Sequence, residues 1–182
     1  MISFVDLQQE HLELVMGWRL KPEVSQFMFT DIECDLEKQR QWFARIVRDR
    51  TCRYWVVRFQ GLPIGVVNLA GIDPVHRRCT AGYYIGESAY RNIGAMIPPY
   101  VYNHVFRDMG FRKIYGEVIA GNGNVLKMHA LHGFREVGVY HEHVYKDGRF
   151  HDVVLIELLA EDWLKQKRYQ GYVASLTQGG TC

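Results

Sequence analysis

The stretch that decides the fold begins Tyr90-Arg91-Asn92-Ile93-Gly94-Ala95-Met96 and ends Asn122-Gly123-Asn124-Val125-Leu126-Lys127-Met128-His129-Ala130-Leu131-His132-Gly133-Phe134. Its first part joins an expected strand, 79–85, to an expected helix, 94–109. A basic, glycine-containing turn that opens a helix is suited to phosphates, because unpaired backbone N–H groups and the positive end of the helix dipole meet there. The second part predicts a short helix over 122–132, which Gly133 ends as a C-cap.

A strand expected at 113–119 lies between the two parts, so a βαβ unit with parallel strands should span 79–119. Apolar periodicity and turn residues predict strands at 2–5, 54–59, 64–69, 137–145 and 151–158, and helices at 7–20, 36–49 (capped by Asp35) and 161–169. This order predicts an α+β fold: a mixed, mostly antiparallel central sheet of about seven strands with helices on both faces. We expect residues 1–169 to form a single domain and 170–182 a mobile tail.

The composition argues against several classes of function. The 182 residues are 48% hydrophobic, which is enough for one domain with a sizeable core. A formal net charge of +2 predicts neither nucleic acid nor an acidic membrane as partner, and no apolar run approaches the ~20 residues of a transmembrane helix. The first residues do not resemble a signal peptide. Four scattered cysteines without a CxxC spacing indicate a reducing cytoplasm rather than a zinc or disulfide framework.

The turn from Arg91 to Met96 is ambiguous by itself. Gly94 would let a pyrophosphate approach the backbone, and Arg91 could add charge-assisted hydrogen bonds. A lone Arg-x-x-Gly is nevertheless frequent by chance, and Gly94 could simply permit the turn. No Gly-Lys-Ser/Thr follows and no GxGxxG is present, so the turn is neither a P-loop nor a Rossmann fingerprint.

The segment from Asn122 to Phe134 favours the phosphate-binding interpretation of the turn. With the turn before it, the pattern Asn-x₅-Met-x₄-Gly-Phe resembles the GCN5-related N-acetyltransferase (GNAT) superfamily, and the order of elements fits over nearly the whole chain. The resemblance implies a GNAT fold, acetyl-CoA as cofactor and an Asn122 that lies at the pantetheine arm. The residues implied to bind the cofactor are Tyr83, Ile85, Arg91, Asn92, Ile93, Gly94, Ala95, Met96 and Asn122.

Two residues depart from the family pattern. Met96 stands where the family often has Gly or Ala, which crowds the phosphate turn. His129 stands where the family usually has the tyrosine that protonates the leaving thiolate. We therefore expect His129 either as that general acid, since imidazole titrates near neutral pH, or as a pocket-lining side chain.

The resemblance also implies a general base and an oxyanion site. Glu117, on the expected strand 113–119, has the spacing of a base that works through water, although it could equally lie on a solvated strand face. Asp73 and His76 are rival proton acceptors. In the family, the strand corresponding to 81–86 bulges and its backbone amides, here near Tyr84, hold the acetyl carbonyl. Tyr83 and Tyr84 must point to opposite faces, so one of them at most can face the pocket.

The order of residues from Trp18 to Gly86 is similar to that of the acetyltransferases of pseudaminic acid biosynthesis, apart from Gln41, where a histidine is often found nearby. The similarity implies the 4-amino group of a UDP-linked 4-amino-4,6-dideoxy sugar as acceptor. The aromatic and Met-rich segment 18–43 would suit a uracil and a deoxysugar methyl group, although helix packing would use the same residues. Expected substrate-binding residues are Trp18, Arg19, Met28, Trp42, Asp73, His76, His141 and His143.

Alternatives stay open. His141 and His143 should face one side of a strand, but without a third ligand no metal is expected. The segment 73–78 resembles spermidine acetyltransferases, for which Asp31, Glu33, Asp35 and Glu37 would supply an acidic pocket. Ribosomal-protein N-terminal acetyltransferases share the overall order. A catalytically inactive acyl-CoA-binding regulatory module is a fourth possibility, and a homodimer is a candidate assembly.

Overall fold

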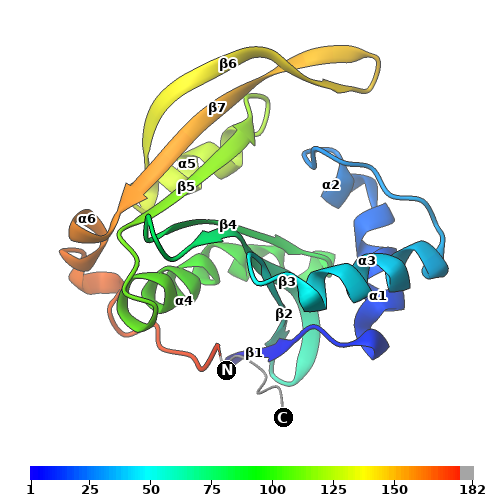
Figure 1. Cartoon of the computed structure of the whole chain (residues 1–182), viewed down its shortest axis with the longest axis horizontal. Helices are drawn as coiled ribbons and strands as arrows, with labels where there is room; N and C mark the ends of the chain where they lie inside the picture. The colour runs from blue at the N-terminus through cyan, green and yellow to red at the C-terminus, as the bar shows by residue number, and fades with distance from the viewer. Residues whose placement is uncertain (177–182) are drawn as a thin grey trace.

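The computed structural model describes residues 1–176, which contain a seven-stranded sheet. The strands lie in the order β1-β2-β3-β4-β5-β7-β6, with helices on both faces of the sheet (Figure 1). Neighbours are antiparallel except β4 and β5, which are parallel as the βαβ unit predicts. The predicted α+β fold and strand number are therefore confirmed. The strands are β1 (Ile2–Asp6), β2 (Arg53–Phe59), β3 (Leu62–Asp73), β4 (Arg78–Ile85), β5 (Lys113–Ile119), β6 (Arg135–Lys146) and β7 (Arg149–Leu159).

The helices differ from the predictions mainly in continuity. The helix expected over 94–109 is divided into a 3-10 helix, η2 (Ser88–Met96), an α-helix, α4 (Pro98–Asn103), and a π-helical turn, η3 (His104–Asp108). Prolines at the first two positions of α4 lack the N–H donors that would join it to an α-helix before them. The others are η1 (Gln9–His11), α1 (Leu12–Leu20), α2 (Pro22–Ser25), α3 (Leu36–Arg48), α5 (Gly123–Leu131), α6 (Ala160–Leu164) and η4 (Lys167–Tyr169).

Two apolar clusters attach these helices to the sheet. The larger contains Tyr102 of α4, Phe134 after α5 and Trp163 of α6. The smaller lies under α1 and α3 and includes Trp18. No helix among the described residues is long and apolar enough to span a membrane. The clusters leave the sheet covered on both faces around β2, β3 and β4.

The chain after α6 packs against α4. The ring centroids of Tyr172 and Tyr100 are 5.1 Å apart, and the Asn103 side chain donates to the Tyr172 carbonyl at 2.8 Å. Leu176 is 3% exposed. Within the predicted tail, residues 170–176 thus pack on the domain through aromatic and apolar side chains, while 177–182 lie outside the described residues.

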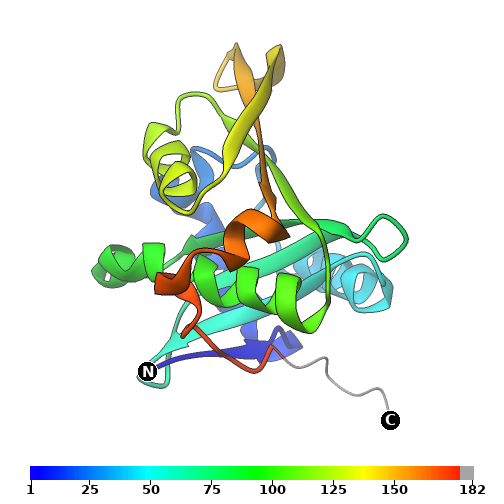
Figure 2. The same cartoon turned by 90° about the vertical axis from the view of Figure 1, so that its left-hand side faces the viewer.

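The β6–β7 hairpin projects beyond the rest of the sheet (Figure 2). Its turn, Asp147-Gly148, has φ angles of 51° and 79°, the left-handed pair that a two-residue hairpin turn requires. In Figure 1 the hairpin arches over α5 and β5 towards the loop that follows α2. It therefore reaches the α1–α3 side of the molecule from the opposite edge of the sheet.

Candidate functional site

The parallel pairing of β4 with β5 stops after three residue pairs, the last being Thr80 with Tyr115. Beyond that point β4 continues to Ile85 without a strand on this edge in the described chain. The Gly86 amide donates to the Ile64 carbonyl at 2.8 Å, so in the alternating antiparallel ladder Tyr84 is hydrogen-bonded to β3. The backbone N–H groups of Tyr83 and Ile85 consequently point towards the diverging β5. This divergence supplies backbone donors for a ligand inserted between the two strands.

This geometry corrects the expectation for Tyr84. Its backbone groups belong to the ladder with Val66, and its side chain packs in the smaller cluster beneath α1. Burial raises the pKa of Tyr84, and the nearby Arg19 guanidinium partly opposes that rise. Tyr84 therefore does not lie at the reacting centre, and Tyr83 and Ile85 are the residues with free amides.

The bulge expected within 81–86 is also displaced. The register of β4 with β3 is continuous from Thr80 to Ile85. The irregularity comes at its end, where the amides of Gly86 and Glu87 both donate to the Ile64 carbonyl, at 2.8 and 3.1 Å. The bulge therefore redirects the chain into η2 and leaves the strand before it regular.

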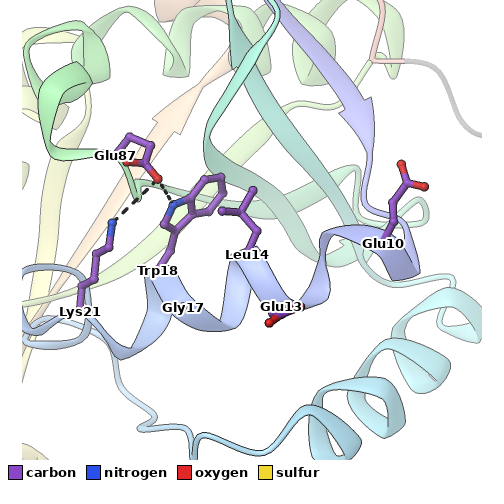
Figure 3. Close-up of a pocket in the computed structure, with 7 residues that line it drawn as sticks. All are labelled: Glu10, Glu13, Leu14, Gly17, Trp18, Lys21 and Glu87. Carbon is purple, nitrogen blue, oxygen red and sulfur yellow. Dashed lines mark hydrogen bonds and ion pairs between the residues drawn. The ribbon is translucent and has the colours of Figure 1, made fainter.

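Trp18 explains why a glycine stands at that bulge. A Cβ on Gly86 would come within 2.1 Å of the indole ring of Trp18, which is 1% exposed. Figure 3 shows Trp18 of α1 and Lys21, the residue that follows this helix, both directed at Glu87. The Trp18 Nε1 donates to Glu87 at 2.6 Å, and Lys21 donates to the Gly86 carbonyl at 2.7 Å. Trp18 is thus a buried anchor for the end of β4, and its predicted contact with substrate stays a prediction, since it also lines the pocket of Figure 3.

The predicted phosphate segment forms η2, which packs against the free edge of β4. A Cβ on Gly94 would lie 3.5 Å from the Ile85 side chain and 3.8 Å from the Tyr83 ring, so η2 packs on the side chains of the two residues with free amides. Arg91 is exposed and forms an ion pair with Glu23 of α2 at 3.1 Å. The other side chains named for the cofactor are spread over this short helix: Asn92, Ala95 and Met96 are exposed and Ile93 is partly buried. A 3-10 helix uses its own carbonyls as partners for most of its amides, so phosphates would have to rely on Arg91 or on local unwinding.

His129 lies close to this edge of β4. The Tyr83 hydroxyl contacts Met128 Sδ at 2.8 Å, which joins β4 to α5 one residue before His129. The ring of His129 packs on Phe134 with centroids 4.7 Å apart, and its Nδ1 is 3.4 Å from the Tyr102 hydroxyl. Contacts through the Tyr83 side chain therefore link β4 both to η2 and to α5, the helix that carries His129. Asn122, the N-cap of α5, lies at the start of the same helix.

Burial changes the chemistry expected of His129. The residue is 9% exposed, and desolvation, reinforced by the neighbouring His132, lowers its pKa to about 4. The imidazole is therefore neutral at pH 7 and does not act as an imidazolium acid. A neutral imidazole can still donate a hydrogen bond from its N–H. Burial likewise raises the pKa of Tyr83 to about 12, so its hydroxyl is also neutral.

The candidates for a base are separated. Glu117 is exposed on β5, on the face opposite Ile114 and Val118, whose side chains enter the larger cluster. Asp73 and His76 lie in the exposed β3–β4 turn, at the end of β4 opposite to η2, where their side chains pair at 2.7 Å. Asp73 also accepts from the His76 amide, so turn formation accounts for this pair.

The hairpin histidines are not a matched pair. The β6–β7 register shifts between Tyr140 and Val144, and Glu142 has a φ of 50°. This bulge disrupts the alternation that would place His141 and His143 on one face, so that expectation is wrong. His141 contacts Asp152 at 3.0 Å, and His143 packs on Tyr140. No group of three His, Cys, Asp or Glu side chains in residues 1–176 could hold a metal ion.

The acceptor side is bounded by the loop between α2 and α3. Arg19 donates from Nη2 to the Thr30 carbonyl at 2.8 Å. Met28 is partly buried in the same loop, and Trp42 of α3 packs edge-on against Tyr54 at 5.2 Å. Arg19, Met28 and Trp42 thus lie on the α1–α3 side of the sheet, as expected for side chains that meet an acceptor.

An ion pair that the sequence did not predict joins the β6–β7 hairpin to the α2–α3 loop on this side. Lys146, at the tip of β6, contacts Asp31 of the α2–α3 loop at 2.5 Å, and its side chain is only 5% exposed. The two residues are 115 positions apart, and Lys146 reads as an ordinary hairpin residue beside Asp147-Gly148. Its position at the tip of the projecting β6–β7 hairpin, not its identity, brings it to the α2–α3 loop.

Comparison with known proteins agrees with this geometry. Residues 2–135 match the model of the acetyltransferase (GNAT) domain. Acetyltransferase PseH from two Campylobacter jejuni strains is 23% identical over 132 residues, which cover 72% of this chain and 82% of PseH. The solved structure of spermidine N-acetyltransferase from Vibrio cholerae, in complex with CoA and spermine, superposes with a TM-score of 0.83 at 20% identity and covers 90% of this chain and 98% of that one.

The residues present fit the cofactor of this family, acetyl-CoA. The divergence of β4 from β5 frees the amides of Tyr83 and Ile85 for the pantetheine and acetyl group, and Arg91 supplies a cation beside η2. Gly94 keeps η2 close against this edge. With the domain match covering most of its length, the chain belongs to the GNAT family of acetyl-CoA-dependent N-acetyltransferases.

Proposed function

We propose that this N-acetyltransferase acts on the 4-amino group of a UDP-linked 4-amino-4,6-dideoxy sugar, as its resemblance to the pseudaminic acid pathway enzymes implies. One observation supports this over a polyamine. The four carboxylates that would attract a polycation are already engaged within the chain. Asp31 pairs with Lys146, Glu33 with Lys38, and Glu37 with Arg40, while Asp35 caps α3 by accepting from two backbone amides.

Two cations on the acceptor side support an anionic acceptor. Arg19 and Lys146 approach the α2–α3 loop from α1 and from β6, and each uses only part of its donors there. Within residues 1–176, Arg19 contacts the loop through Nη2 alone, which donates to the carbonyl and hydroxyl oxygens of Thr30. Guanidinium and ammonium groups with spare donors suit the phosphates of a nucleotide.

The proposed chemistry uses a small number of groups. Acetyl-CoA supplies an activated acetyl thioester and a thiolate leaving group. The amides of Tyr83 and Ile85 would donate to the developing oxyanion. Stabilisation of the oxyanion is usually the largest single contribution to the rate enhancement of an acyl transfer. His129 would donate a hydrogen bond from Nε2 to the departing sulfur. Glu117, exposed on the face of β5 opposite Ile114 and Val118, would accept the amine proton through water.

A polyamine acceptor is the second candidate. The similarity in fold to the Vibrio cholerae spermidine N-acetyltransferase favours it. At 20% identity, however, this similarity is evidence of the fold alone. It would require the ion pairs of Asp31, Glu33 and Glu37 to open when substrate arrives. Each exposed pair contributes little to stability, so opening would be inexpensive for Glu33 and Glu37. It would be more costly for Asp31, whose partner is buried.

The test is CoA release with three acceptors assayed separately: a UDP-linked 4-amino sugar, spermidine and a peptide with a free N-terminus. We expect turnover with the nucleotide sugar and an increase in KM, without loss of kcat, when Lys146→Met removes the buried cation. Lys38→Met is the matched control, since it removes an exposed lysine from the neighbouring pair. Turnover confined to spermidine, or stimulated by Lys146→Met, would refute the sugar assignment.

A further inference from the structure

A second titratable side chain lies behind His129. The Tyr102 hydroxyl of α4 is 3.4 Å from Nδ1 of His129, and Tyr102 is 2% exposed. Its ring is enclosed by Phe134 and Trp163, with centroids 5.4 and 5.2 Å away. Tyr102 therefore cannot turn to solvent, and its hydroxyl must find its partner inside the protein. Hydrogen bonds of this length are common in ligand-free sites and shorten when substrate binds.

The direction of this hydrogen bond follows from donor satisfaction. Within residues 1–176, Nδ1 of His129 is the partner found for the Tyr102 hydroxyl. If Nδ1 carried the proton and donated it, the hydroxyl hydrogen would be buried without an acceptor, which is strongly unfavourable. The hydroxyl therefore donates to Nδ1. A neutral imidazole that accepts at Nδ1 carries its proton on Nε2.

The other nitrogen of His129 is available to a ligand. Nδ1 of the adjacent His132 is fully buried and makes no hydrogen bond in the described chain. Nε2 of His129 also makes no hydrogen bond in the described chain, but unlike His132 Nδ1 it is not fully buried. The contact between Tyr83 and Met128 keeps this part of α5 beside the free edge of β4. The exposed nitrogen of a neutral ring is thus the one that bears the proton.

We propose that Tyr102 is a positioning residue of the acetyl transfer, because its hydroxyl fixes the imidazole proton of His129 on Nε2. This inference rests on the proposed role of His129. Nε2–H donates a hydrogen bond to the sulfur as the C–S bond breaks and its electron pair passes to sulfur. The proton lost by the amine restores the thiol, so the imidazole gives up no proton in the balance. A tyrosine at position 129, as the family usually has, carries its own hydroxyl and needs no such neighbour.

A double-mutant cycle tests this dependence. Tyr102→Phe removes the hydroxyl and keeps the ring, and we expect kcat to fall about tenfold or more with the KM for acetyl-CoA within about twofold. In a His129→Tyr background, which restores the family residue, the same change should alter kcat by less than about twofold. Tyr100→Phe is the matched control on the same helix. Equal losses in both backgrounds would mean that Tyr102 only packs, and would overturn the proposal.

A second readout needs no substrate. Nitrogen-15 NMR of the ligand-free protein should show the Nε2–H tautomer of His129 in the wild type and a shift towards Nδ1–H in Tyr102→Phe. An unchanged tautomer overturns the proposal whatever the kinetics show. If the tautomer shifts but His129→Ala keeps the wild-type kcat, the role of His129 in the proposed function has failed, and the catalytic meaning of Tyr102 fails with it.

Discussion

Acid should destabilise this fold through two buried histidines. His129 and His132 are 9% and 1% exposed. Burial lowers the pKa of each from 6.5 to about 4. The neighbouring His132 adds to this effect for His129, and the Arg168 guanidinium adds to it for His132. The unfolded chain therefore binds protons that the folded chain rejects. The stability due to the neutral rings is complete above pH 6.5 and is lost as the pH falls towards 4.

The size of this effect follows from the two pKa values. Linkage gives a loss of about 2 kcal/mol for each histidine between pH 7 and pH 5. Together this is about 4 kcal/mol, a large share of the roughly 5–15 kcal/mol by which domains are usually stable. The His132 ring contacts Tyr102 and the His129 ring contacts Phe134, so both imidazoles are held within the larger apolar cluster.

Urea unfolding at pH 7, 6 and 5 measures this loss. His132→Phe removes one titrating ring and keeps an aromatic side chain, so its loss between pH 7 and 5 should be about half that of the wild type. His143→Gln, on the exposed edge strand β6, is the control and should follow the wild type. An equal loss of stability in His132→Phe and the wild type would refute the reasoning.

Three further predictions follow from single contacts. Gly86→Ala places a Cβ 2.1 Å from the Trp18 ring and should destabilise the fold by about 1–3 kcal/mol, measured by urea unfolding. Glu23→Gln should lower the KM for acetyl-CoA, because it frees the predicted phosphate ligand Arg91, and Arg91→Ala should raise that KM about tenfold; the opposite order would contradict the role of Arg91. Asp31→Asn frees the buried Lys146 ammonium for the acceptor phosphates and should lower the acceptor KM while the acetyl-CoA KM stays constant; a rise in the acceptor KM would contradict the role of Lys146.

The fold could be predicted well because its signals are local. Alternation and turn residues located the strands, and Asp35 caps α3 by accepting from the amides of Glu37 and Lys38, as expected. The break in the helix expected over 94–109 comes from Pro98 and Pro99, which lack backbone N–H donors. The packing of the tail residues 170–176 depends on contacts with α4, a helix about 70 residues earlier in the chain, which no local pattern describes.

The site could be predicted only in part because its decisive features are long-range. The motif identified η2 and α5, which do lie side by side through Gly94, Tyr83 and Met128. The environment of His129 could not be read from its neighbours in sequence, since Tyr102 approaches it from another helix. The packing role of Trp18 could not be predicted either, since aromatic residues serve binding and packing equally and its contact with Gly86 joins positions 68 residues apart.

The most direct test of the account is a competition between acceptors. Equal concentrations of a UDP-linked 4-amino-4,6-dideoxy sugar, spermidine and a peptide with a free N-terminus are mixed with limiting acetyl-CoA, and mass spectrometry identifies which molecule carries the acetyl group. Competition reports the ratio of kcat/KM values directly. We expect the acetyl group on the amine of the nucleotide sugar. Acetyl found mainly on spermidine or on the peptide would contradict it.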